Sequence, residues 1–323
     1  MTLAATPPPT VAEVTRNGFV ESVHRAHVVV VDADGEVIDM LGDADSPMLP
    51  RSCNKPLQAV GMLRCGLDLP GPLLALASGS HDGEDFHVAG VAEMLDSFGF
   101  RPGDLANPAD YPQFEPARVR WIVSGRGPEP IAMNCSGKHA AMLATCRGAN
   151  WESTGYLDTK HPLQVALSET VSALTDRSAP PSAVDGCGAP VFEASLRGLA
   201  RAFGRLAAAK AGPELAVADA IRTFPEWASG TTRDEALLHR QAAGIVAKAG
   251  AEGTYAIGLA DGRGVALKVD DGAARARSAI VTTILRGLGL DVCLPSAPVL
   301  GGGTAVGSLR TLPVLAAFAR STR

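Results

Sequence analysis

The chain has 323 residues, of which 46% are apolar and 20% are charged, and its formal net charge is −5. These proportions are ordinary for a globular protein and exclude a disordered or fibrous chain. The mild negative charge and the lack of a basic run argue against nucleic acids and anionic membranes as partners. We therefore expect one compact domain over residues 1–323, with residues 1–15 as a flexible tail.

The first ten residues contain three consecutive prolines but neither a basic leader nor an apolar stretch of signal-peptide length. Apolar runs such as 28–31 and 73–77 are far shorter than the roughly 20 residues that a membrane span needs. The six cysteines are dispersed, which is typical of free thiols or a metal site rather than a disulfide framework. The sequence thus predicts a cytoplasmic protein without a transmembrane segment.

Two short strands, 27–32 and 36–41, are predicted around the turn Ala33-Asp34-Gly35. Helical patterns follow at 84–98, 163–174 and 192–209, and another occurs at 273–287. A second hairpin is predicted from 254–260 and 264–269, on either side of Asp261-Gly262-Arg263. Strands at both ends with helices between them favour an α+β (mixed α/β) fold, in which helices cover one antiparallel sheet, because parallel units would alternate more regularly.

The segment Arg51-Ser52-Cys53-Asn54-Lys55-Pro56 predicts the start of a helix, because a helix tolerates proline only in its first turn. Ser52 then lies where backbone N–H groups are free and the helix dipole favours negative charge, which suits a nucleophile. Lys55 follows three positions later on the same helical face, near enough to accept the hydroxyl proton if the lysine is neutral. These two residues are therefore candidate catalytic residues.

A neutral Lys55 requires a pKa roughly three units below the ordinary value of about 10.4, which corresponds to about 4 kcal/mol. Burial or a second cation would have to supply this shift, and Lys268, in the alternating stretch Val265 to Val269, is a candidate for that cation. A simpler interpretation is that Ser52 caps the helix while both lysines point to water. These residues alone leave both interpretations open.

Two further segments combine thiols with glycines: Asn134-Cys135-Ser136-Gly137-Lys138-His139 and Val184-Asp185-Gly186-Cys187-Gly188. The two thiols could hold zinc with His139 or Lys138 as a further donor, although no C-x-x-C pair is present. Alternatively, both cysteines are buried as small apolar residues. Asp185 is either a turn residue or a partner for the α-ammonium group of a substrate.

A third segment, Ser78-Gly79-Ser80-His81-Asp82-Gly83-Glu84, follows an apolar run and precedes a predicted helix. Its hydroxyl, imidazole and carboxylate groups lie at a junction that suits catalysis. The same residues could also be a plain helix cap.

Taken together, these segments resemble the L-asparaginase II family of the rhizobial type. The resemblance rests, in chain order, on Arg51-Ser52-x-x-Lys55-Pro56-x-Gln58, Ser78-x-Ser80-His81-x-x-Glu84-Asp85, Asn134-Cys135-Ser136-Gly137-Lys138-His139 and Asp185-Gly186-Cys187. It extends to 254–258 and 267–272, and so covers most of the chain from about His24. That family is similar in fold to serine β-lactamases and glutaminases, so the resemblance implies such a fold here.

The resemblance also implies an amidohydrolase that converts L-asparagine into L-aspartate and ammonia and that forms homodimers. Ser52 with Lys55 and Ser80 with Lys268 resemble the family's two serine-lysine pairs. Cys135, Lys138 and Cys187 resemble its zinc ligands, and we expect the substrate to be bound by Asp185, Arg51 and His139. Because a lysine must be neutral to bind zinc, we expect the metal to support the pocket without performing the chemistry itself.

In the expected reaction Lys55 removes the Ser52 proton, the serine attacks the amide carbon, and helix N–H groups stabilise the oxyanion. Ser80 and Lys268 would then relay a proton to the departing ammonia. The Ser-x-x-Lys arrangement also fits a serine acylase acting on β-lactams or peptidoglycan, although the lack of a secretion signal disfavours it. A non-catalytic protein that binds amino acids or zinc is the third hypothesis.

Overall fold

The computed structural model describes residues 7–321 and divides them into two compact units, each made of discontinuous segments. The first unit contains the described residues up to Cys53, Ala194–Ala208 and the described residues from Leu237 onward. The second unit contains Asn54–Glu193 and Ala209–Ala236. The single domain expected over residues 1–323 stays a prediction.

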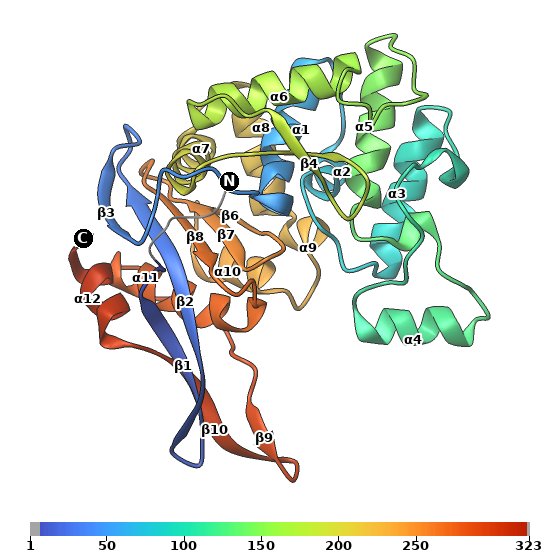
Figure 1. The fold of residues 1–323 in the computed structure, drawn as a ribbon. Coiled ribbons are helices and arrows are strands. Elements are labelled where there is room, and N and C mark those ends of the chain that lie inside the picture. The colour runs from blue at the N-terminus through green and yellow to red at the C-terminus, as the bar shows by residue number, and fades with distance from the viewer. Residues whose placement is uncertain (1–6, 322–323) are drawn as a thin grey trace. The chain divides into compact units, whose positions relative to one another are not determined.

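An antiparallel sheet of eight strands is the centre of the first unit (Figure 1). The strand order is β6-β7-β8-β2-β1-β10-β9, and β3 pairs with β2 beside this path. The strands are β1 (Thr10–Arg16), β2 (Phe19–Val31), β3 (Val37–Leu41), β6 (Val246–Ala249), β7 (Thr254–Gly258), β8 (Gly264–Val269), β9 (Val299–Gly301) and β10 (Thr304–Thr311).

Both predicted hairpins are confirmed, since β2 pairs antiparallel with β3 and β7 pairs antiparallel with β8. The pairing of β2 with β8 joins the two hairpins in one sheet and sets His27 opposite Lys268. The first strand was predicted too short, because β2 begins at Phe19 rather than at His27. The extra residues pair with β1, a strand that the sequence did not suggest.

The flexible tail expected over residues 1–15 is wrong for residues 10–15, which belong to β1. This strand lies between β2 and β10, and Val11, Ala12 and Val14 are fully buried. Residues 1–6 lie outside the described residues. The local turn Asn17-Gly18, with positive φ at both residues, joins β1 to β2 in a hairpin, and this turn signal was overlooked; the second neighbour, β10, comes from the far end of the chain.

Three helices pack on the sheet of this unit. The first, α7 (Leu196–Ala208), lies against β2, β7 and β8. The approach is so close that a Cβ added to Gly258 would meet the carbonyl oxygen of Phe203 at 1.8 Å. The other two, α11 (Arg277–Gly287) and α12 (Pro313–Ser321), pack against each other and join the apolar core that contains Val28, Val265 and Leu267. The helices predicted at 192–209 and 273–287 are thus confirmed, although α7 begins at Leu196 and α11 begins at Arg277.

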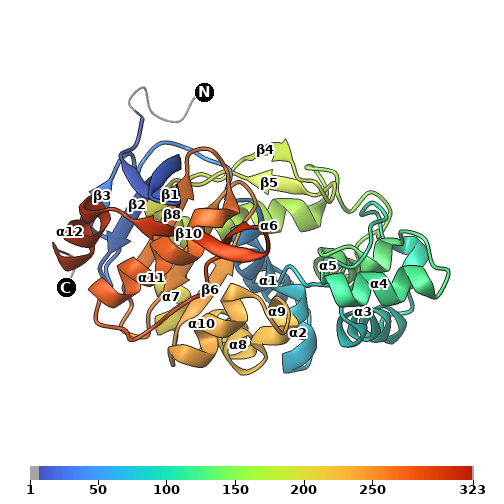
Figure 2. The same cartoon turned by 90° about the horizontal axis from the view of Figure 1, so that it is seen from below.

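The second unit is mainly helical (Figure 2). Its helices are α1 (Lys55–Arg64), α2 (Gly71–Ala77), α3 (Asp85–Ser97), α4 (Glu115–Val123), α5 (Ser136–Gly148), α6 (Pro162–Thr175), α8 (Gly212–Thr223) and α9 (Pro225–Ala228). A small hairpin joins β4 (Pro181–Val184) to β5 (Pro190–Phe192), and α10 (Asp234–Gln241) begins where this unit ends. The helices predicted at 84–98 and 163–174 correspond to α3 and α6.

These elements confirm the α+β fold class, with an antiparallel sheet and helices packed on it. In the second unit, α1, α2 and α5 pack on one another. Within residues 7–321, no helix combines the length and the apolar character that crossing a membrane requires.

Candidate active site

The first candidate nucleophile, Ser52, lies in a 3-10 turn, Arg51–Asn54, that runs directly into α1. Pro56 occupies the first turn of α1, as predicted, and Asn54 already has helical dihedral angles of −71° and −19°. Arg51 has a φ of +53°, a left-handed conformation that is uncommon for a residue other than glycine. Such backbone strain is concentrated at functional sites, which supports a role for the turn that carries Ser52.

Lys55 is almost completely buried, with 1% of its surface exposed. Its Nζ donates a hydrogen bond to Ser80 Oγ at 2.7 Å and another to Cys135 Sγ at 3.0 Å. The start of α1, the loop after α2 and the start of α5 therefore meet at one point. This geometry brings together three of the predicted site residues and does not fit the interpretation of Lys55 as a solvated surface lysine.

Lys268 belongs to the first unit and is 8% exposed, so it does not point to water either. Its neighbours in β8, Val265, Leu267 and Val269, lie in the apolar core, and strand alternation places Lys268 on the opposite face, as predicted. The Nζ donates to the carbonyl oxygen of Val269 at 2.6 Å. Burial lowers the pKa of Lys268, against the opposing effect of nearby carboxylates. Its pairing with Ser80 stays a prediction.

The two predicted zinc-ligand thiols lie together in the second unit. Cys135 precedes α5, Cys187 lies in the turn between β4 and β5, and both belong to one small buried cluster. Lys138, on the first turn of α5, donates from Nζ to Cys187 Sγ at 3.2 Å and is 2% exposed. The structure thus brings Cys135, Lys138 and Cys187 to one place, as the sequence predicted.

The surroundings shift the pKa values of the two thiols in opposite directions. The hydrogen bond with Cys187 and burial raise the pKa of Cys135, and the same hydrogen bond lowers the pKa of Cys187. Burial tends to lower the pKa of Lys138, but the two sulfurs and Asp185 raise it above its ordinary value. These surroundings favour the thiolate form of Cys187 over that of Cys135.

The two buried sulfurs are ligands that zinc prefers, whereas Lys138, whose pKa is raised, would have to lose its proton to become a nitrogen ligand. Next to it, His139 is buried beside Cys187, whose sulfur opposes the lowering of the histidine's pKa by burial. Among residues 7–321, no three His, Cys, Asp or Glu side chains form a metal-holding group. Zinc at this place would therefore need Lys138 as its third ligand.

The predicted substrate-binding residues lie in different surroundings. Asp185 is half-buried in the β4–β5 turn and close enough to Lys138 to raise the pKa of that lysine. His139 is fully buried, and its Nδ1 lies 2.7 Å from the Tyr156 hydroxyl. Burial lowers the pKa of His139 to about 4, so its imidazole is neutral at pH 7. Arg51 belongs to the strained turn beside Ser52, and the substrate contacts of all three stay predictions.

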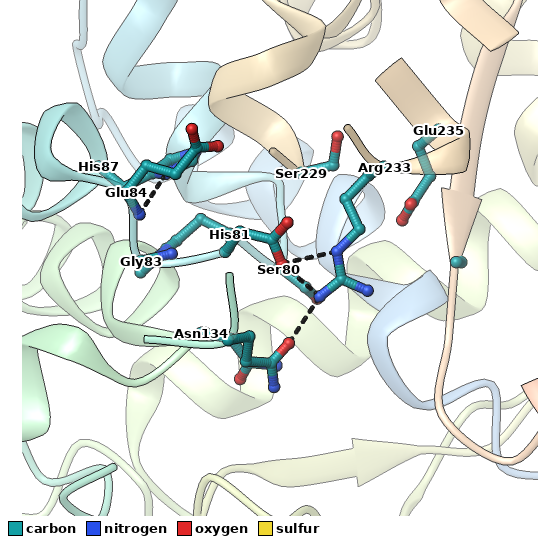
Figure 3. Close-up of polar contacts among 12 residues, drawn as sticks. Ser80, His81, Gly83, Glu84, His87, Asn134, Ser229, Arg233 and Glu235 are labelled. Atoms are coloured by element: carbon teal, nitrogen blue, oxygen red, sulfur yellow. Dashed lines mark hydrogen bonds and ion pairs between the residues drawn. The ribbon is translucent and has the colours of Figure 1, made fainter. Parts of the chain in front are cut away.

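The loop that carries Ser80 forms hydrogen bonds with several neighbouring segments (Figure 3). The Ser80 N–H donates to the carbonyl oxygen of Ala228, and the His81 N–H donates to that of Asn134, both at 3.0 Å. His81 is fully buried, and its Nδ1 accepts from the Gly83 N–H at 3.1 Å. Its Nε2 therefore carries the proton and donates to Ser136 Oγ at 2.9 Å. His81 thus ties the loop to α5 and is not available as a general base.

The partner of Asp82 was not predicted from the sequence. Arg233 Nε donates to Asp82 Oδ1 at 2.6 Å, and Arg233 Nη2 donates to Gln113 Oε1 at 2.7 Å. Figure 3 shows the Arg233 side chain directed toward the loop between Ser80 and Gly83. Residues 82 and 233 are too far apart in the chain for spacing to suggest a pair, and the only signal was an unassigned polar run at 231–235.

His87 holds the start of α3 and provides a test of this packing. Its Nδ1 accepts from the Glu84 N–H at 3.1 Å, and its Nε2 lies 2.8 Å from the carbonyl oxygen of Glu226, to which it donates. Burial lowers its pKa to about 4, although the bond to Glu226 and the charge of Glu84 oppose the shift. Protonation of Nδ1 would break the bond to Glu84.

We therefore expect the free energy of unfolding to fall as the pH falls from about 6.5 to about 4, where the unfolded chain binds more protons than the folded one. His87 alone contributes about 3 kcal/mol to this loss. Glutamine can keep both hydrogen bonds but does not titrate. In urea unfolding at several pH values, His87→Gln should therefore lose less stability on acidification than wild type. An unchanged pH dependence would contradict this assignment.

Comparisons with known proteins identify one family and several structural neighbours. The sequence profile of the L-asparaginase II family matches residues 12–301. No curated protein sequence matches the chain. Among solved structures, one protein named Mglu is 16% identical with a TM-score of 0.45, over 81% of this chain and 67% of that one. A Bacteroides dorei protein described as a "putative beta-lactamase" is 14% identical with a TM-score of 0.43, and the match covers 81% of this chain and 93% of that one.

Proposed function

Because the chain belongs to the L-asparaginase II family, we propose that this amidohydrolase converts L-asparagine into L-aspartate and ammonia by means of a serine nucleophile that a lysine activates. The observation that carries the proposal is the environment of Lys55, a buried lysine within hydrogen-bond distance of the Ser80 hydroxyl. A buried amine beside a hydroxyl is the arrangement that serine-lysine catalysis requires. A small amide is the substrate class that the family implies.

In the proposed reaction Ser52 attacks the amide carbon after Lys55 takes its proton. Two features support this assignment: Ser52 precedes α1 by one turn, and the residue before it is held in a strained conformation. Helix N–H groups at this end favour the negative charge of the oxyanion. Ser80, hydrogen-bonded to Lys55, is placed to pass that proton to the leaving ammonia, and water then releases L-aspartate.

We further propose that Cys135, Lys138 and Cys187 hold zinc. The support is that two buried sulfurs and the Lys138 nitrogen lie together, and Lys138 would lose its proton on binding the metal. When bound, zinc would hold the start of α5 against the β4–β5 turn, and its positive charge would stabilise the Cys135 and Cys187 thiolates. The homodimer and the cytoplasmic location remain predictions.

Ammonia release is the direct test. Purified protein should release ammonia from L-asparagine, and the released amount should equal the L-aspartate formed, as a coupled enzymatic assay and amino-acid analysis would measure. L-Glutamine, small peptides and a chromogenic β-lactam should be assayed in parallel, with mass spectrometry to detect a covalent adduct.

The outcomes separate the three hypotheses. Turnover of L-asparagine supports the proposal, whereas a stable adduct with the β-lactam and no ammonia would indicate the acylase. A rise in melting temperature with L-asparagine but no product would indicate a non-catalytic binding protein. Either of the last two results would contradict the proposed function.

A further inference from the structure

We infer that Arg233 is a positioning residue that holds the loop carrying Ser80 in its catalytic place, an inference that rests on the proposed function. The relevant parts are the loop 78–84 with the start of α3, and the segment 226–233 that follows α8. Both belong to the second unit, and they are joined at four points. The contacts are Ser80 N to Ala228 O (3.0 Å), His87 Nε2 to Glu226 O (2.8 Å), Thr231 N to Glu84 Oε1 (2.8 Å) and Arg233 Nε to Asp82 Oδ1 (2.6 Å).

At two glycines the segments approach each other too closely for a larger residue. A Cβ added to Gly79 would lie 1.9 Å from the carbonyl oxygen of Ala228. A Cβ added to Gly230 would lie 2.4 Å from Asp82 Oδ2. Since real Cβ atoms do not approach so closely, each glycine is required by the neighbouring segment, and the position of one segment dictates that of the other.

Arg233 also binds a third segment that supports the same loop. The Gln113 and Phe114 N–H groups both donate to the carbonyl oxygen of Asp82 at 2.9 Å, and the Gln113 side chain accepts from Arg233 at 2.7 Å. One guanidinium therefore holds the Asp82 carboxylate and the segment that binds the Asp82 carbonyl. A planar guanidinium can bond to both partners in fixed directions, whereas a lysine amine offers a single centre.

Asp82 is two residues from Ser80, whose N–H is fixed by Ala228 and whose hydroxyl meets Lys55. The Asp82 side chain is only 5% exposed, so the loss of Arg233 would leave a carboxylate buried without its cation. The loop would then have to shift to solvate it. A displacement of about 1 Å at a reacting group costs roughly 100-fold in rate. Arg233 thus acts on Ser80 through Asp82.

The test uses Arg233→Gln, Asp82→Asn and the double variant in the full chain, with kcat and KM for L-asparagine and the melting temperature of each. We expect kcat to fall roughly 30-fold to 100-fold in each single variant, with KM within about threefold of wild type. The double variant should be no slower than the slower single variant, since both substitutions remove one interaction. Arg120→Gln is the matched control, because Arg120 pairs with Asp85 at 3.4 Å on an exposed surface nearby.

Arg233→Lys keeps the charge and tests the geometry if Arg233→Gln does not fold. It should melt within a few degrees of wild type, yet its kcat should fall at least about fivefold. A kcat within about twofold of wild type in Arg233→Lys and Asp82→Asn, or fully multiplicative losses in the double variant, would overturn the inference. An inactive wild-type protein would instead refute the proposed function, so the two failures are distinguishable.

Discussion

The Ser52→Ala variant is expected to lose turnover of L-asparagine by about 10³-fold or more, because it removes the atom that we propose as the nucleophile. Its free energy of unfolding should change by no more than about 1 kcal/mol, the usual effect of losing a serine at a helix start. Steady-state ammonia release and urea unfolding measure the two quantities. The prediction follows from the strained turn Arg51–Asn54 and from the position of Ser52 one turn before α1.

The matched control for this variant is Ser182→Ala, which removes an exposed hydroxyl in the second unit and should leave kcat unchanged. Ser80→Ala is the informative comparison, because Ser80 is the hydroxyl that accepts from Lys55. If Ser80→Ala abolishes turnover while Ser52→Ala stays near wild type, Ser80 is the nucleophile and Ser52 is a capping residue.

Lys55→Met is the second substitution with a large expected effect. Methionine fills a similar volume but cannot accept a proton, so turnover should again fall by about 10³-fold or more. Stability should change little or rise, since a buried charge is replaced by an apolar group of similar size. Melting temperature and kcat therefore move independently, and this separates a catalytic role from a structural one.

The control is Lys160→Met, at an exposed lysine of the same unit. Activity should stay at the wild-type level in this variant. A Lys55→Met protein that keeps more than about a tenth of wild-type turnover would show that another group is the base. A coordinated loss of melting temperature and activity would point to a structural lysine instead.

Much of the architecture was predictable because it is encoded locally. Turn residues between alternating apolar stretches predicted the β2–β3 and β7–β8 hairpins, and helical spacing predicted α3 and α6. The pairing of β1 with β10 was not predictable, since β10 is almost the whole chain length away, although the turn Asn17-Gly18 could have indicated the hairpin of β1 with β2. Residues 10–15 were mistaken for a tail because this hairpin signal was overlooked.

For the site, the short motifs identified Lys55, Ser80, Cys135, Lys138 and Cys187, and the structure places Lys55 with Ser80 and Lys138 with Cys187. The hydrogen bond of Lys55 to Ser80 could not be predicted from residue spacing, because Ser80 lies 25 residues further along the chain, on a separate loop. Residue spacing also could not show that Lys55 and Lys138 are buried, and burial decides whether a lysine faces water or lies among sulfurs and hydroxyls.

The sequence by itself determined the chemical groups of this protein: a serine-lysine turn at a helix start, two thiols beside a lysine, and the hairpins and helices that carry them. Only the tertiary structure decided which of these groups touch, and it added Arg233, which no motif marked, as the partner of Asp82. The physical reason is that residue types and backbone preferences are local properties. Contacts such as Lys55 with Ser80 depend on how distant segments pack.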